Sequence, residues 1–504
     1  TKGGGKVETW QPQFTYYGFR YVQVEGAVPV GKSNPENLPV VESITGLHSC
    51  NSADEAGSFS CSKPMFNQIH SLIDWAIRSN IASVFTDCPH REKLGWVSDA
   101  YLMQFSLQYR YNLVRQYAKI MEDMRHAQLS NGCIPTIAPE YVRFRGGFED
   151  SPEWGSAFVI CPWYVYKWYG DTSLLKEYYP DMQRFVDYLG TRSQNHIVAY
   201  GLGDWFDIGP KRPGHAQLTS NGVTCTEVYY YNVKVLQNAA TLLGKSDDAA
   251  RYAELSEKIK KSFIEKFYNP ANGKIDRNSQ TANAVSLYAD LIPNGSRDAI
   301  LQHLIDDIRG RNNALTSGNI GFSYLLRTLE NAGRSDIIFD MNSKYDVPGY
   351  GWQLANGATA LTESWQAYDF VSNNHSMLGH LMEWFYGGLG GIKQKENSLA
   401  FREIVIDPQI VGDIKSATTS YESPYGTIRC KWKLTEKDYE LEVSIPANCT
   451  AEILIRAKDI NQITTYGLPL SKSDDIKVDG LEPSGKWKIK VGSGNYQFQV
   501  SEKK

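Results

Sequence analysis

The segment Asp87-Cys-Pro-His-Arg-Glu-Lys-Leu-Gly-Trp-Val-Ser-Asp99 stands directly before a long run of helical periodicity. Pro89 and Gly95 exclude one continuous helix here, so we predict a loop whose side chains are free to converge. The loop holds three carboxylates and a tryptophan: Asp87, Glu92, Asp99 and Trp96. Such groups can donate a proton, accept hydrogen bonds from hydroxyls and cover the face of a sugar ring. The segment therefore predicts a sugar-hydrolysing loop, and a solvated charged turn is the alternative.

Helical periodicity continues outward from this loop, from about residue 62 to residue 390. We expect helices at 65–79, 100–128, 156–169, 173–189, 224–243, 247–267, 280–291, 296–308, 317–330, 335–341 and 373–387, with room for a twelfth between 347 and 370. The loops differ greatly in length and no fixed repeat recurs, which argues against a repeat array. We therefore predict an (α/α)6 toroid, in which long loops meet at one end and carry the chemistry.

Both flanks of the helical block have strand-like patterns. Residues 14–24 form a short β-type run, followed by a connector rich in Pro, Gly and Asn at 29–39. Beyond residue 391, apolar and polar residues alternate at 439–445, 451–455, 486–491 and 496–500. The fold class is thus mainly α with flanking β-sandwich segments. The expected domains are the end of an upstream β domain with its linker (1–45), the catalytic barrel (46–391) and a C-terminal β-sandwich (392–504).

Composition narrows the function classes. The 504 residues are 42% hydrophobic and 21% charged, which is ordinary for globular proteins. A net charge of −4 lacks the excess of positive charge that nucleic-acid-binding proteins use, so a nucleic-acid partner is not expected. No apolar run approaches the roughly 18–20 residues needed to span a bilayer. The 12% aromatic content suits carbohydrate surfaces, although it could equally fill large cores.

Neither the cysteines nor the histidines have the spacing of a metal site. The eight cysteines are scattered, with no CxxC motif and no Cys/His cluster, so neither zinc nor a dithiol redox centre is indicated. His380 and Glu383 have helical i,i+3 spacing but lack a third ligand at matching spacing. We expect no metal and no other cofactor.

Three further loops are rich in tryptophan and carboxylates, at 140–154, 203–221 and 349–369. The last contains Glu363, which lies 271 positions after Glu92 (363 − 92) and can therefore face it across a ring-shaped domain. Aromatic residues in such turns can also simply anchor a loop to the barrel wall. His375, at the start of the last expected helix, is either a substrate ligand or a histidine bonded to the backbone.

The motifs resemble those of a known family. They are the 87–99 segment, the turn Gly203-Asp-Trp205, the segment Thr362-Glu-Ser-Trp365 and the helix containing Asn374-His375, Gly379-His380 and Glu383-Trp-Phe-Tyr386. Together they resemble the inverting α-L-rhamnosidases of glycoside hydrolase family 78, over essentially the whole chain. The 87–99 motif is highly specific, whereas the Gly-Asp-Trp turn alone would be weak.

The resemblance implies an exo-acting enzyme that removes terminal α-L-rhamnose from glycans or glycosides, in the periplasm or outside the cell. It makes Glu92 the general acid and Glu363 the general base. The expected substrate-binding residues are Asp87, Arg91, Trp96, Asp99, Trp154, Asp204, Trp205, Trp352, Trp365 and His375. Independently of the resemblance, an inverting hydrolase needs its two carboxyls roughly 6.5–9.5 Å apart. Carboxylates from distant loops can meet this requirement across a toroid mouth.

Two other classes remain open. One is another (α/α)6 carbohydrate enzyme, either a hydrolase of a different sugar or a polysaccharide lyase. A lyase would use a basic groove for its acidic sugar, and no Lys/Arg-rich loop accompanies the carboxylate motifs. The other is a non-catalytic glycan-binding protein on the same scaffold, against which the presence of both glutamates counts.

Overall fold

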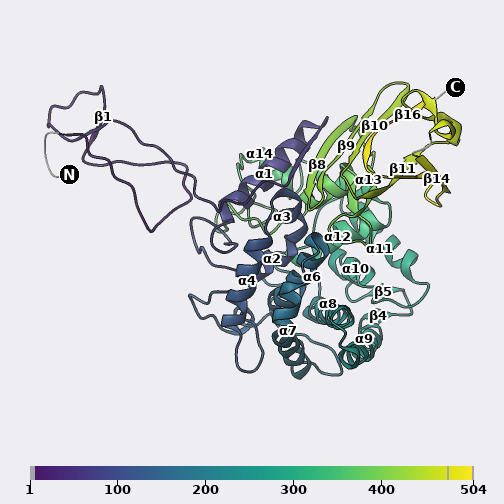
Figure 1. The fold of residues 1–504 in the computed structure, drawn as a ribbon. Helices are drawn as coiled ribbons and strands as arrows, with labels where there is room; N and C mark the ends of the chain where they lie inside the picture. Colours follow the sequence, from purple (N-terminus) through teal and green to yellow (C-terminus); the bar gives the residue numbers. More distant parts are fainter. Residues whose placement is uncertain (1–5, 474–475, 502–504) are drawn as a thin grey trace.

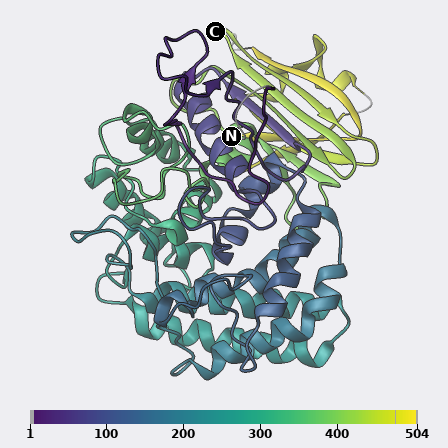
Figure 2. The same ribbon diagram turned by 90° about the vertical axis from the view of Figure 1, so that its left-hand side faces the viewer.

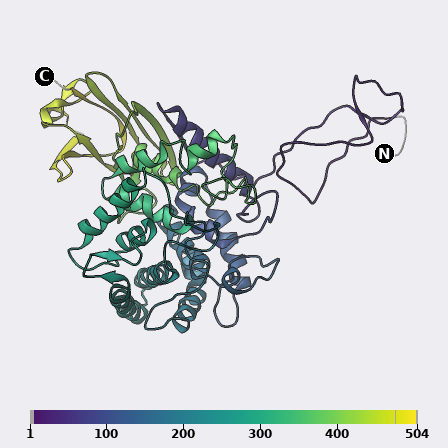
Figure 3. The same ribbon diagram turned by 180° about the vertical axis from the view of Figure 1, so that it is seen from behind.

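A computed structural model describes residues 6–473 and 476–501. The helices form one body, a β-sandwich lies against one end of it, and the N-terminal segment that contains β1 (Val28–Pro29) projects as an arm (Figures 1, 2 and 3). Within the described residues, no helix combines the length and apolarity that crossing a membrane requires. All eight cysteines are free thiols.

The helical body contains the expected helices, with small shifts of their ends except in the ranges 100–128 and 373–387. The α-helices are α1 (Pro64–Asn80), α2 (Val97–Leu102), α3 (Gln104–Arg110), α4 (Val114–Ala127), α5 (Pro152–Gly155), α6 (Ala157–Tyr169), α7 (Ser173–Thr191), α8 (Asn221–Leu242), α9 (Ser246–Phe267), α10 (Gln280–Tyr288), α11 (Arg297–Gly310), α12 (Asn319–Asn331), α13 (Ser335–Asn342), α14 (Tyr350–Ala355) and α15 (Leu381–Trp384). A 3₁₀ turn η1 (Gly146–Phe148) precedes α5, and a π-helical turn η2 (Phe385–Leu389) follows α15. Helix α14 occupies the place left open for a twelfth helix.

Two expected helices are wrong in extent. The range 100–128 is divided among α2, α3 and α4. The first break falls at Met103, and the second at Tyr111, which is extended and forms a β-bridge with Glu55. The range 373–387 becomes helical only at Leu381. Before that, the His375 N–H donates to the Leu361 carbonyl at 2.8 Å, which ties this stretch to a neighbouring loop.

The C-terminal sandwich confirms the alternation in sequence. One sheet has the strand order β13-β12-β16-β10-β9-β8-β3 and the other β14-β15-β11-β7-β6. Their strands are β3 (Gly57–Cys61), β6 (Ile392–Gln394), β7 (Glu403–Ile406), β8 (Ser416–Ser423), β9 (Gly426–Leu434), β10 (Asp438–Ile445), β11 (Thr450–Arg456), β12 (Ile463–Thr465), β13 (Leu468–Pro469), β14 (Ile476–Leu481), β15 (Lys486–Val491) and β16 (Gly494–Ser501). Short 3₁₀ turns η3 (Ile460–Gln462) and η4 (Leu470–Lys472) flank β12 and β13, and a small hairpin pairs β4 (Tyr268–Asn269) with β5 (Lys274–Ile275).

The barrel and the sandwich share a boundary that the sequence did not reveal. Strand β3 precedes α1, inside the range 46–391 expected for the barrel, yet it pairs antiparallel with β8 of the sandwich. At the C-terminal end of the helical segment, the Trp432 indole N–H donates to the Leu389 carbonyl at 2.9 Å. The sandwich therefore contacts both ends of the helical segment.

The N-terminal arm departs from expectation. Residues 14–24 are irregular, and the arm's strands are only β1 (Val28–Pro29) and β2 (Val40–Val41), paired in parallel. Many apolar side chains of residues 14–24 are exposed, including Phe14 at 98% and Tyr21 at 90%. A strand is stabilised by its hydrogen-bonded neighbours, and no described strand lies beside this segment. The local β-type pattern therefore does not produce a strand here.

Candidate active site

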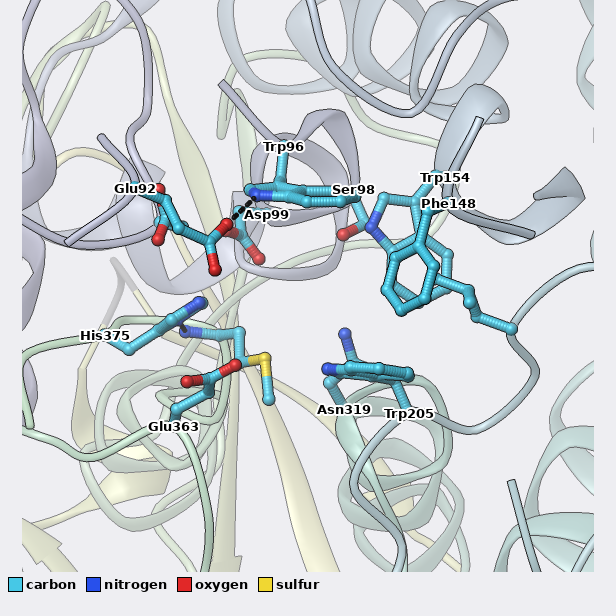
Figure 4. Close-up of a pocket in the computed structure, with 13 residues that line it drawn as sticks. Glu92, Trp96, Ser98, Asp99, Phe148, Trp154, Trp205, Asn319, Glu363 and His375 are labelled. Carbon is cyan, nitrogen blue, oxygen red and sulfur yellow. Dashed lines mark hydrogen bonds between the residues drawn. The ribbon is translucent and has the colours of Figure 1, made fainter. Parts of the chain in front are cut away.

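Side chains from several loops and from the starts of neighbouring helices surround a pocket (Figure 4). Its lining residues are Asp87, Glu92, Trp96, Ser98, Asp99, Phe148, Trp154, Leu202, Trp205, Asn319, Glu363, His375 and Met377. The pocket has about 460 Å³ of space between its lining atoms, including the solvent at its open mouth. It gathers side chains from all the loops that the sequence singled out.

The loop that carries Glu92 is closed at its base by a pair of hydrogen bonds. The Asp87 N–H donates to the Leu94 carbonyl at 3.0 Å, and the Leu94 N–H donates to Asp87 Oδ1 at 2.8 Å. Asp87 is buried, whereas Glu92 lies exposed near the tip of the loop. The Trp96 indole N–H donates to Glu92 Oε2 at 3.0 Å (Figure 4). This bond directs the Glu92 carboxyl toward the pocket.

Asp99 is a deeply buried carboxylate of the site. It lies in the first turn of α2 and is 3% exposed. Burial, followed by the charges of Asp87, Glu363 and Glu92, raises its pKa well above the usual range. Its Oδ2 atom has no hydrogen-bond partner within the described part of the chain. An unpaired buried polar atom is costly, so a ligand hydroxyl at this position would be bound favourably.

Glu363 approaches the pocket from an irregular loop. The Ser372 N–H donates to Glu363 Oε2 at 2.8 Å, and the Glu363 N–H donates to the Ser372 carbonyl at 2.9 Å. Burial raises the pKa of this carboxyl, against the lowering effects of the Ser372 N–H and of the nearby Arg91 and His90. Figure 4 shows Glu92 and Glu363 on two sides of the pocket, with His375 between them.

His375 is bonded to the backbone and also lines the pocket, and its role as a substrate ligand stays a prediction. Its Nδ1 accepts a hydrogen bond from the Met377 N–H at 3.2 Å, which places the ring proton on Nε2. Burial lowers the pKa of His375 to about 4, although the Asp87 carboxylate opposes this shift. At neutral pH the ring is therefore an uncharged hydrogen-bond donor.

Aromatic rings form the apolar wall of the pocket. Trp96 stacks on Phe144 with ring centroids 5.3 Å apart, and Phe148 meets Trp205 edge to face at 5.4 Å. Trp154 is 3% exposed and completes this side. Such faces suit the C–H surface of a pyranose or a methyl group.

Four expected substrate-binding residues lie outside the pocket lining and instead hold the surrounding loops. The exposed Arg91 donates to the Phe370 carbonyl at 2.9 Å. The Trp352 and Trp365 indoles donate to the carbonyls of Gln366 and Ser317, at 3.3 and 2.8 Å respectively.

Asp204 is the fourth of these residues. It is fully buried. Its carboxylate accepts hydrogen bonds from the Thr281 hydroxyl of α10 and from the N–H groups of Gly318 and Gly321 around the start of α12. Spacing in the sequence does not show to which side of a loop a residue points.

Five lining residues were missed by the sequence analysis: Ser98, Phe148, Leu202, Asn319 and Met377. Asn319 is the most informative, because its amide O and N are buried and lack hydrogen-bond partners among the described residues. Its backbone N–H donates to the Trp205 carbonyl at 2.9 Å. In sequence, Asn319 was indistinguishable from an ordinary residue at a helix start.

Across residues 6–473 and 476–501, no group of three or more His, Cys, Asp or Glu side chains is placed to hold a metal ion. The His380 ring lies against Phe322, with centroids 5.7 Å apart, and Glu383 forms an ion pair with Arg327 at 2.9 Å. These two residues are therefore engaged with other parts of the core.

Paired carboxylates in an aromatic pocket at the loop end of a helical barrel define the class of six-hairpin glycosidases. The family model for the bacterial alpha-L-rhamnosidase 6 hairpin glycosidase domain matches residues 54–389. The models for the bacterial alpha-L-rhamnosidase C-terminal domain and concanavalin-like domain match residues 391–465 and 1–47. The chain belongs to the bacterial α-L-rhamnosidase family, and the expected (α/α)6 toroid with β domains is confirmed.

Individual relatives agree with this placement. An alpha-L-rhamnosidase from Streptomyces avermitilis is 31% identical over 511 residues, covering 99% of this chain and 46% of the relative. The structure of alpha-L-rhamnosidase from Dictyoglumus thermophilum has a TM-score of 0.82 at 29% identity, covering 90% of this chain and 51% of that one. The Streptomyces avermitilis enzyme complexed with L-rhamnose has a TM-score of 0.80 at 28% identity, covering 90% and 43%. The chain spans about half the length of the curated relatives it matches.

Proposed function

We propose that this protein is an exo-acting, inverting glycoside hydrolase that removes terminal α-L-rhamnose from glycans or glycosides. The observation that carries the proposal is the meeting of Glu92 and Glu363, from loops far apart in sequence, in one aromatic pocket. The relatives that are named α-L-rhamnosidases support the choice of sugar.

In the proposed reaction, Glu92 donates the proton to the departing oxygen. Its position near the pocket mouth and its hydrogen bond from Trp96 fit a group that meets the leaving group. Glu363 takes the proton from the attacking water. The Ser372 N–H holds its carboxylate in place, and burial strengthens it as a base by raising its pKa. Inversion follows when water attacks the face opposite the leaving group.

The sugar would be recognised by polar groups on one side and rings on the other. Asp99 and Asn319 have buried polar atoms that no described protein group satisfies, so they suit ring hydroxyls. His375 adds an uncharged donor. The 6-methyl group of rhamnose fits the wall of Trp96 and Trp205, where burial of apolar surface is favourable.

Three measurements test this proposal. NMR of the first-formed sugar should show β-L-rhamnose before mutarotation, and initial release of the α-anomer would refute inversion. Replacing Glu92 by Gln should slow rhamnosides with poor leaving groups far more than activated aryl rhamnosides, within the roughly 10²- to 10⁴-fold range of general acid catalysis. Glu363→Gln should slow both substrate types alike. Failure to hydrolyse any α-L-rhamnoside, alongside cleavage of another glycoside in a p-nitrophenyl panel, would reassign the sugar.

The proposal includes a location in the periplasm or outside the cell, which family resemblance supports. Fractionation of the source cells, followed by immunodetection with an antibody against the purified chain, tests this point. Detection confined to the cytosol would refute it.

A further inference from the structure

Residues 16–20 of the N-terminal arm lie directly on the loop that carries Glu92. The Gly18 N–H donates to the Pro89 carbonyl at 2.9 Å. A Cβ atom at Gly18 would lie only 2.9 Å from Pro89 Cγ, so the two segments are in close contact and a larger residue would separate them. This contact fixes the arm at one point of the loop.

A second contact involves Lys93, the neighbour of Glu92. Lys93 has φ +57°, a left-handed conformation that is unfavourable for most residues other than glycine. Its ammonium lies 4.1 Å from the centroid of the Tyr17 ring and donates to the Tyr16 carbonyl at 3.2 Å. Such backbone conformations persist only where surrounding contacts hold them. The arm supplies these contacts one residue away from Glu92.

The same five-residue segment also reaches the loop that carries Glu363. The Arg20 guanidinium donates to Thr359 Oγ1 at 3.2 Å and to the Gly357 carbonyl at 3.5 Å. Thr359 lies four positions before Glu363 (363 − 359). This part of the chain is irregular and receives little rigidity from helical hydrogen bonds. Residues 16–20 therefore bridge the two loops whose carboxylates face the pocket.

We propose that residues 16–20 form a positioning clamp that sets the placement of Glu92 relative to Glu363, with Lys93 and Arg20 as its two attachment points. The inference rests on the proposed function, because it assigns these residues to the alignment of the proposed acid and base. Alignment matters strongly, since a displacement of about 1 Å can cost about 10²-fold in rate. The clamp residues are positioning residues and do not touch the sugar.

The test uses the full chain with one variant at each attachment point. Lys93→Asn removes the ammonium but keeps a residue that tolerates the left-handed conformation. Arg20→Ala removes the contact with the Glu363 loop. The matched control is Lys32→Asn, at an exposed lysine elsewhere on the arm. Lys93→Arg and Arg20→Lys serve as conservative variants. Each protein is assayed with an aryl and an alkyl α-L-rhamnoside, and its melting temperature is recorded.

The two attachment points should give different signatures. Lys93→Asn should lower kcat/KM about 10- to 100-fold for the alkyl substrate and only about threefold for the aryl substrate, since only the former depends on proton donation. Arg20→Ala should lower both by a similar factor of about 10, because water activation serves both. The conservative variants should recover most of the activity, and the control should match the wild type. Melting temperatures should stay within about 2 °C, because the clamp contributes little to the core.

If the wild type hydrolyses rhamnosides and both clamp variants have the same kcat/KM as the wild type, the clamp is refuted and the proposed function stands. An equal loss on both substrates in Lys93→Asn, together with a lower melting temperature, would also overturn it. Hydrogen exchange gives a readout that does not require activity. Amides of 87–94 should exchange at least about fivefold faster in Lys93→Asn, and those of 357–363 in Arg20→Ala. Unchanged exchange in both would refute the clamp even if no rhamnoside is cleaved.

Discussion

Replacing Asp204 by Asn should destabilise the barrel, because this carboxylate anchors the start of α12. Asp204 Oδ2 accepts hydrogen bonds from Thr281 Oγ1 at 2.5 Å and the Gly318 N–H at 2.9 Å, while Oδ1 accepts from the Gly321 N–H at 2.8 Å. All three partners are donors. In asparagine, an NH₂ group replaces one of the two carboxylate oxygens. That NH₂ group is itself a donor, so it faces at least one backbone N–H donor without forming a hydrogen bond.

The cost follows from this geometry. A hydrogen bond to a charged group contributes roughly 1.5–3 kcal/mol, and a buried donor left unpaired costs roughly 1–3 kcal/mol. The variant loses one such bond and weakens the remaining ones, but it no longer buries a charge. Burial does raise the pKa of Asp204, so that charge carries a penalty. We expect a net loss of roughly 2–4 kcal/mol in the free energy of unfolding.

Calorimetry can measure this loss. With an unfolding entropy of about 2.1 cal/mol/K per residue, 504 residues give roughly 1 kcal/mol/K, so the melting temperature should fall by roughly 2–4 °C. Asp369→Asn is the matched control, since Asp369 is exposed and its substitution should stay within about 0.5 kcal/mol. An unchanged melting temperature combined with a large loss of L-rhamnose affinity would refute the anchoring role and return Asp204 to the sugar site.

Three further predictions follow from burial and from the pocket. His380 is buried, and desolvation together with the nearby Arg327 lowers its pKa to about 3, below the unfolded value of 6.5. The unfolded chain therefore binds a proton that the folded chain does not, so the free energy of unfolding is highest above pH 6.5 and decreases as the pH falls toward 3. His380→Phe should therefore shrink the stability difference between pH 7.5 and pH 5 by about 2 kcal/mol in urea titrations, and an unchanged difference would contradict the assignment. Asp99→Asn should weaken L-rhamnose binding at least about tenfold by titration calorimetry without lowering the melting temperature, whereas unchanged affinity would assign Asp99 to scaffolding. α-L-Rhamnosides should outperform α-L-mannosides by no more than about 10²-fold in kcat/KM, because apolar walls reject one added hydroxyl only modestly; equal rates would argue against an aromatic wall at the methyl group.

Helices with a clear apolar stripe could be located from sequence alone. The expected ranges 173–189 and 247–267 differ from α7 and α9 by at most two residues at either end. The failure at 100–128 has a long-range cause, because Tyr111 is pulled into a β-bridge with Glu55. Likewise, β3 could not be assigned to the sandwich, since its partner β8 lies more than 350 positions away.

Pocket residues could be predicted where a reactive residue type lies within a specific sequence motif. Glu92 and Glu363 could be paired because two specific motifs carry them, and both line the pocket. The direction of a side chain was not predictable, as Trp365 shows by pointing into the core, where its indole N–H donates to Ser317. The place of Asn319 in the pocket could not be predicted, because it depends on side-chain amide atoms that the fold buries without a described hydrogen-bond partner.

The pairing of β3 with β8 bears on how the chain is made. Ser58 and Ser420 are hydrogen-bonded partners 362 positions apart, so this sheet edge can form only after the whole barrel has been synthesised. Loops of this length close slowly, and topologies rich in distant contacts fold slowly. During synthesis, β3 therefore stays unpaired while the helices that follow it are made. An unpaired strand edge can form hydrogen bonds with other chains and so promote aggregation. A barrel fragment ending near residue 391 would keep that edge open permanently, so the helical domain and its sandwich are best regarded as one folding unit.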